Sequence, residues 1–247
     1  MIFTLAAKEL KILFASPLAW VVLAILEAVI AYVFLNQIDA FDAIQPKLAQ
    51  LANAPGITEI IVAPLFASVA TILLMTVPLL SMRLLAEEKR NRTLPLLMSA
   101  PLSMTEIVLG KFLGLLFFLA AVVAMPTLMA LSLYVGGRLD PGLLLGNLLG
   151  VVLLAASFSA LGLYISSLTA QPIIAAMGTL GALLGLWLIN QSATEPDSVL
   201  HYVSVIKHFE PFNKGLINTS DVAYFALFTL TFLVLTVRRL DRERLGG

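Results

Sequence analysis

Three sites in the sequence carry polar residues whose types and spacing suit proton transfer, metal binding or contact with a partner protein. The first site is the single residue Glu27. It lies in the middle of an apolar run. An ionisable group at that depth is costly to bury, so Glu27 is a candidate for lining a substrate path or carrying a proton. A structural role is the alternative, in which a protonated or hydrogen-bonded Glu27 joins two helices. Hydroxyl partners for that role occur in other apolar runs, at Ser68, Thr71, Thr76, Ser157 and Ser159.

The second group is His201, His208 and Glu210, in a polar and aromatic segment. Two histidines seven residues apart share one face of a helix, and Glu210 could reach that face as a third metal ligand. This spacing is not a compact metal motif. We therefore favour an interfacial helix whose aromatic side chains lie at the level of the lipid headgroups, and we predict no metal site.

The third group is the charged segment 83–104, which reads RLLAEEKRNRTLPLLMSAPLSM. Its first part predicts a charged helical extension, and a short apolar piece follows between Pro95 and Pro101. Apolar side chains on an aqueous segment need a cover, which is either the membrane interface or a groove of a partner protein. The residues alone leave both covers open.

Nucleotide chemistry is not expected on this chain. A phosphate-binding loop needs Gly-x-x-x-x-Gly-Lys-Ser/Thr, because backbone N–H groups hold the phosphate and a hydroxyl holds Mg²⁺. Gly110-Lys111-Phe112 lacks the earlier glycine and the hydroxyl, so we interpret Lys111 as a lysine that reaches toward the membrane surface. The absence of cysteine excludes cysteine nucleophiles, and neither histidine lies in an apolar run. The chain is therefore predicted not to be an enzyme.

The composition indicates that the elements carrying these residues lie in a lipid bilayer. Hydrophobic residues make up 60% of the chain and charged residues 12%, and the mean hydropathy is +0.99. Soluble domains have about 45–50% apolar and about 25% charged residues, so a soluble globular protein is excluded. The net charge is zero and no basic patch is interleaved with aromatic residues, so no nucleic-acid partner is expected.

Apolar runs and capping signals predict an all-α polytopic membrane protein with a single transmembrane domain over 1–247. Residues 1–15 are predicted to form an amphipathic interfacial helix, and 191–220 an outer loop. Ser16-Pro17, a capping box at Ser103 and Asp140-Pro141 mark helix starts. The predicted spans cover about 17–36, 60–82, 106–135, 142–165, 172–190 and 221–237.

The basic residues predict that both termini lie in the cytoplasm. Eleven of the fifteen Lys and Arg residues fall in the N-terminal segment, in 83–111 and in the tail after the last span. Four fall on the other side. Basic residues concentrate in the cytoplasmic segments of membrane proteins. An even number of spans places both ends on one side, and six satisfies that condition.

The segment LLAEEKRNRTLPLLMSAPLSMTEIVLGKFLG resembles the signature region of type-2 ABC exporter permeases. AAKELKILFASPLAW is similar to their interfacial elbow helix. HFEPFNKGLINTSDVAYF, with the last span and the Arg-rich tail, resembles the gliding-motility-associated branch. That branch is related to the permease that serves copper maturation of nitrous oxide reductase. Two residues depart from the pattern, since Arg92 replaces a frequent glycine and Pro95 replaces a frequent acidic residue.

The resemblance implies a permease driven by a separate ABC ATPase subunit, which would bind the ATP and Mg²⁺, with no cofactor on this chain. Segment 83–104 would be the coupling helix that docks into a cleft of the ATPase. Its apolar residues would fill the cleft and its charged residues would fix the register. The residues that match the motif are Glu87, Glu88, Arg92, Thr93, Leu94, Leu96 and Leu97.

The same resemblance implies a dimer with a second copy or a related permease. It also implies export of a substrate that the sequence does not identify, across a bacterial or archaeal cytoplasmic (inner) membrane. Two other functions stay open. One is a secondary transporter that is coupled to protons through Glu27. The other is a membrane scaffold or maturation factor that acts through the 191–220 loop on an extracytoplasmic accessory protein.

Overall fold

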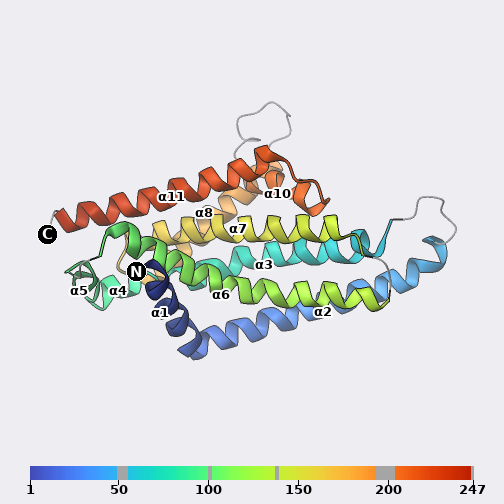
Figure 1. Ribbon diagram of the computed structural model, residues 1–247, viewed down its shortest axis with the longest axis horizontal. Coiled ribbons are helices and arrows are strands. Elements are labelled where there is room, and N and C mark those ends of the chain that lie inside the picture. The colour runs from blue at the N-terminus through green and yellow to red at the C-terminus, as the bar shows by residue number, and fades with distance from the viewer. Residues whose placement is uncertain (49–54, 100–101, 137–138, 193–203, 246–247) are drawn as a thin grey trace.

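The computed structural model describes residues 1–48, 55–99, 102–136, 139–192 and 204–245, and within these ranges the chain is helical with no strand (Figure 1). Most of the long helices run along the longest axis of the molecule, and α1 crosses them near one end. The helices are α1 (Ile2–Ala15), α2 (Pro17–Leu48), the π-helix η1 (Thr58–Val62), α3 (Ala63–Ser81), α4 (Ala86–Arg90), α5 (Leu94–Ser99), α6 (Met104–Ser132), the 3₁₀-helix η2 (Leu133–Val135), α7 (Pro141–Leu168), α8 (Pro172–Ser192), α10 (Val205–Asn213) and α11 (Thr219–Leu245).

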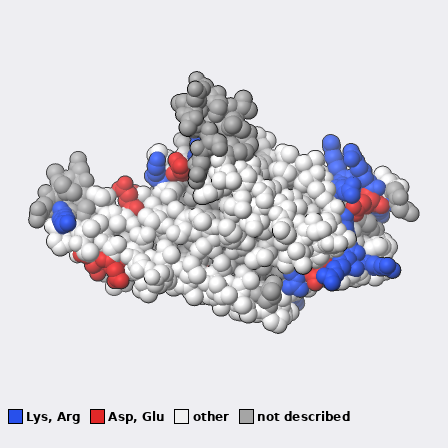
Figure 2. All heavy atoms as spheres, turned by 180° about the vertical axis from the view of Figure 1, so that it is seen from behind, with Lys and Arg blue, Asp and Glu red and all other residues white. Residues whose placement is uncertain are grey.

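Five helical stretches are long and apolar enough to cross a membrane: 19–47, 58–90, 104–135, 141–168 and 219–245. Helix α8 occupies the position of the predicted fifth span, but its apolar part covers only Pro172–Leu188. On the face shown in Figure 2, charged side chains gather toward the two ends of the long axis, and a broad zone with few charged side chains separates them. This distribution fits a multi-pass membrane protein.

Helix α2 extends beyond the apolar run that predicted it. The span was expected to end near Asn36, yet the helix continues to Leu48. Ile38 and Phe41 lie in this extension and pack partly buried against the core, which gives the extra turns an apolar contact. The expected loop therefore starts about three turns later than predicted.

The helix starts at Ser103 and Asp140 follow the predicted capping chemistry. The Ser103 hydroxyl accepts a hydrogen bond from the backbone N–H of Glu106, and the Glu106 carboxylate accepts one from the backbone N–H of Ser103. The Asp140 carboxylate accepts bonds from the backbone N–H groups of Gly142 and Leu143. Each cap supplies acceptors for N–H groups that have no partner inside the helix.

Helix α7 is central, because α3, α6, α8, α10 and α11 all pack against it. Two of its glycines permit the closest approaches. A Cβ at Gly162 would lie 2.2 Å from the Ser81 hydroxyl of α3, and one at Gly150 would lie 2.6 Å from the Phe212 side chain of α10. By contrast, only 11% of the apolar window of α2 and 22% of that of α11 is buried. These two helices carry the outer faces of the bundle.

Candidate coupling site

The segment between α3 and α6 forms two short helices at the end of the molecule where both termini lie (Figure 1). Helix α4 begins after a turn that follows Ser81, and α5 begins at Leu94. Between them Arg92 adopts a φ of +57°, the left-handed region that reverses the chain direction. This residue stands where the resembling permeases often have glycine, which adopts that conformation without strain.

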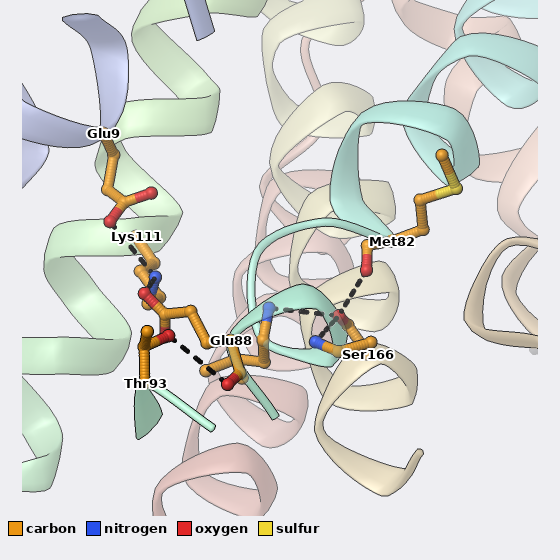
Figure 3. Close-up of polar contacts among 8 residues, drawn as sticks. Glu9, Met82, Glu88, Thr93, Lys111 and Ser166 are labelled. Carbon is orange, nitrogen blue, oxygen red and sulfur yellow. Dashed lines mark hydrogen bonds and ion pairs between the residues drawn. The ribbon is translucent and has the colours of Figure 1, made fainter. Parts of the chain in front are cut away.

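Ser166 of α7 fixes the start of α4 (Figure 3). Its hydroxyl accepts hydrogen bonds from the backbone N–H groups of Leu85 and Ala86, at 3.2 and 3.0 Å, and donates to the carbonyl of Met82 at 3.1 Å. Ser166 is fully buried, so these backbone groups have no water as a substitute partner. One hydroxyl from a distant helix thus serves as the cap that α4 lacks in its own sequence.

A buried lysine joins α4 to the N-terminal helix (Figure 3). The Nζ of Lys111 on α6 lies 3.1 Å from Oε1 of Glu9 on α1 and 2.7 Å from Oε1 of Glu88 on α4. The Lys111 side chain is 1% exposed, so the interpretation of this lysine as reaching the membrane surface is wrong. An ammonium group buried in a protein needs opposite charge, and two carboxylates from other elements supply it.

A second set of charged contacts surrounds this triad. Arg83 bonds to both carboxylate oxygens of Glu87, at 2.8 and 3.3 Å, and to the Ser16 hydroxyl between α1 and α2 at 3.0 Å. A cavity of about 250 Å³ lies between these groups. It is lined by Glu9, Ile12, Leu13, Ser16, Arg83, Leu84, Glu87, Glu88, Asn91 and Lys111. The cavity therefore lies where α1, α4 and α6 meet.

Lys89 ties the other side of α4 to the last helix. Its amino group lies 2.6 Å from Oε1 of Glu243 on α11 and donates to the carbonyl of Ser167 on α7. Glu243 also pairs with Arg239 at 3.4 Å. Helix α4 is thus bonded to α6, α7 and α11, and through Lys111 it is linked to α1, although it has only five residues.

The residues predicted to meet an ATPase divide into inward and outward groups. Glu88 and Leu94 point inward, since Glu88 pairs with Lys111 and Leu94 is 5% exposed in the core. Leu97 is half-buried and packs against that core, while the Leu96 side chain is 72% exposed. The outward group also includes Arg92 and Thr93, which are both exposed. The backbone N–H of Thr93 donates a hydrogen bond to the carbonyl of Glu88.

Glu27 lies on α2, far from this cluster in the sequence. Both of its carboxylate oxygens are buried and neither has a hydrogen-bond partner among the described residues. None of the hydroxyls proposed as its partners forms a hydrogen bond with Glu27. Ser68, Thr71 and Thr76 donate to carbonyls of their own helix, and Ser157 contacts Phe225 and Thr229 of α11. The structure therefore does not bring Glu27 together with these hydroxyls.

His208 and Glu210 lie on α10, whereas His201 lies outside the described residues. The Nδ1 of His208 is 2.6 Å from Oδ1 of Asp221, and the imidazole stacks on Tyr224 with ring centroids 4.0 Å apart. Within the described ranges, no group of three potential metal ligands is brought together. The contacts of His208 instead attach α10 to the first turns of α11.

Comparison with known proteins assigns the chain to a family. A model of an ABC-2 family transporter protein matches residues 3–245, which is nearly the whole sequence. The sequence has no significant match among curated proteins. The match covers the short helices α4 and α5 as well as every helix that is long and apolar enough to span a membrane. The chain therefore belongs to the ABC-2 transporter family and is a multi-pass membrane permease.

Proposed function

We propose that this permease is driven by a separate ABC ATPase subunit that docks on α4 and α5. The observation that carries the proposal is the pairing of an exposed apolar side chain, Leu96, with a firmly anchored support. An exposed leucine on a helix of six residues is a poor contact for water and a good one for an apolar cleft. Arg92 and Thr93 flank it as the polar rim that fixes the register.

The anchoring contacts describe how a movement of the ATPase would reach the membrane helices. Ser166, Lys111 and Lys89 connect α4 to α7, α6, α1 and α11. A displacement of α4 and α5 is therefore shared among these helices rather than lost in a flexible loop. ATP and Mg²⁺ would act on the partner subunit, whose closure must favour one arrangement of these contacts over another.

The proposed topology has six spans, with α8 as the fifth, and an elbow helix at α1. Both termini and α4–α5 then lie in the cytoplasm, in agreement with the distribution of Lys and Arg. The exposed apolar face of α2 supports a dimer with a second copy or a related permease. We propose export across a bacterial or archaeal inner membrane, within the gliding-motility-associated or nitrous-oxide-reductase-maturation branch.

A proton-coupled mechanism through Glu27 is the second candidate. It is favoured by the two buried carboxylate oxygens of Glu27, which have no partner in the described chain. This function predicts transport without an ATPase and its loss in Glu27→Gln. A scaffold that recruits an extracytoplasmic accessory protein through 191–220 has no comparable support, since His208 is engaged with Asp221 and residues 193–203 of that segment lie outside the described residues.

The test of the ATPase proposal is affinity purification of the tagged chain, with mass spectrometry of the proteins that co-purify. We expect a protein with nucleotide-binding motifs to accompany the wild-type chain and to be lost from Leu96→Asp. Ile217→Asp is the matched control, because Ile217 is 55% exposed but lies between α10 and α11, away from α4 and α5. Equal recovery of the ATPase with both variants would show that α5 is not the docking site.

A further inference from the structure

We propose that a groove along α11 and α7 binds an anionic phospholipid. One face of α11 carries Leu227, Thr231, Val234, Arg238 and Arg242, at the four-, three-, four- and four-residue steps that align side chains on a helix. A shallow, open hollow of about 350 Å³, formed by α11 alone, follows this face. It is lined by Leu227, Leu230, Thr231, Val234, Leu235 and Arg238.

A second hollow continues the first toward the C-terminal end of α11. Its volume is about 210 Å³, and Leu235 and Arg238 line both hollows. Tyr164 and Leu168 of α7 form its other wall, and Arg239 and Arg242 complete it. The Tyr164 ring packs on Phe232 with centroids 5.7 Å apart, which holds this wall against α11. The two hollows therefore form one groove that is apolar along most of its length and basic at one end.

The apolar part has the dimensions of one acyl chain. Residues 227–235 rise by about 12 Å along a helix, and half of the hydrocarbon core of a bilayer measures about 15 Å. The Leu227 and Leu230 side chains are 65% and 57% exposed along this stretch, so they are open to lipid. A chain lying on this face would place its headgroup at the level of Arg238 and Arg242.

Asp241 neighbours Arg242 and lies three residues from Arg238, yet it forms no ion pair with either arginine. Arg83, Lys89 and Lys111 are ion-paired at the same end of the molecule, whereas Arg238 and Arg242, like Arg90 and Arg92, form no ion pair within the described ranges. Glu243, the acidic residue nearest in sequence to Arg242 on its C-terminal side, is already shared by Lys89 and Arg239. Figure 2 shows basic side chains gathered at the two ends of the long axis, one of which carries the C-terminal end of α11. Basic pockets between membrane helices recognise anionic headgroups.

The continuity of the groove favours a lipid over a protein partner. An acidic surface of the ATPase would be attracted to the arginines but would not occupy an apolar face that runs into the membrane. A phospholipid satisfies both halves of the groove with one molecule. This inference does not depend on coupling to an ATPase, because the groove involves neither α4 nor α5.

Native mass spectrometry of the full chain in detergent tests the proposal. The probes are phosphatidylglycerol and phosphatidylcholine with identical acyl chains, so only the headgroup charge differs. We expect phosphatidylglycerol to bind more tightly than phosphatidylcholine. Arg238→Gln combined with Arg242→Gln is expected to weaken phosphatidylglycerol binding about twenty-five-fold, at about fivefold for each arginine. Arg244→Gln is the matched control, because Arg244 is exposed but lies six residues from Arg238 and off the stripe.

A second variant tests the apolar half of the groove. Val234→Trp fills the hollow while it leaves all arginines in place, and we expect it to weaken phosphatidylglycerol binding as well. Unchanged binding in Val234→Trp with loss in the arginine variant would show that these arginines bind anions without a chain, and would overturn the proposal. Wild-type lipid affinity in the arginine variant, with or without loss of a co-purifying ATPase, would also overturn it. Gel filtration of each variant verifies that it is folded.

Discussion

Replacing Lys111 by methionine removes the positive centre of the buried triad and leaves its two carboxylates facing each other. The Lys111 side chain is 1% exposed and that of Glu9 is 8% exposed, so water screens their charges weakly. Removal of one partner from a buried ion pair costs about 3–5 kcal/mol, because the remaining charge keeps its desolvation penalty. We expect Lys111→Met to lower the free energy of unfolding by that amount.

The measurement is thermal unfolding of the purified chain in detergent, followed by tryptophan fluorescence. For a chain of this length about 2–4 °C accompanies each kcal/mol, so the expected loss in Tm is roughly 6–20 °C. Adding Glu9→Gln and Glu88→Gln to Lys111→Met is expected to restore more than half of it, since neutral groups replace the unpaired charges. Lys8→Met is the matched control, because Lys8 is exposed on the same helix as Glu9. A Tm for Lys111→Met within 2 °C of that control, or no rescue by the glutamines, would refute the reasoning.

Three further predictions follow from other contacts. Ser166→Ala removes the acceptor of two buried N–H groups, so we expect a loss of about 1–3 kcal/mol and faster amide hydrogen exchange at Leu85 and Ala86; unchanged exchange would contradict the clamp. Gly162→Ala forces apart α3 and α7, and we expect it to lower the free energy of unfolding, measured with denaturant, by about 1–3 kcal/mol. Gly181→Ala serves as its control, because the added methyl group there meets open space. Under the ATPase proposal, Glu27→Gln retains ATP-driven transport in reconstituted vesicles, whereas complete loss would favour the proton-coupled function.

The sequence predicted the helical class, the apolar runs and the local caps, because these depend on residues within one or two turns of each other. Ser103 caps through Glu106 and Asp140 through the two residues after Pro141, as expected from their spacing. The end of α2 was placed too early, since nothing in residues 37–48 alone shows that Ile38 and Phe41 have a core to contact.

The candidate site was harder to predict because its contacts join residues that are distant in the sequence. Lys111 lies 102 residues from Glu9, and the Ser166 hydroxyl bonds to a backbone N–H 80 residues away. A lysine near a predicted helix start was interpreted as reaching the surface, and only the packing of α1 on α6 shows otherwise. The position of Leu96 on the outside of α5 likewise depends on which face Leu94 buries, and the sequence of a six-residue helix that contains Pro95 does not reveal that face.

The pairing of Glu9 with Lys111 also constrains the order in which the protein is assembled. At a synthesis rate of about 5–20 residues per second, the 102 residues between them take roughly 5–20 seconds to appear. Throughout that interval the Glu9 carboxylate exists without the ammonium group that compensates it in the folded protein. The N-terminal helix therefore docks only after α6 has been inserted. A nascent chain arrested before residue 111 should leave α1 open to proteolysis, and one arrested well beyond it should protect it.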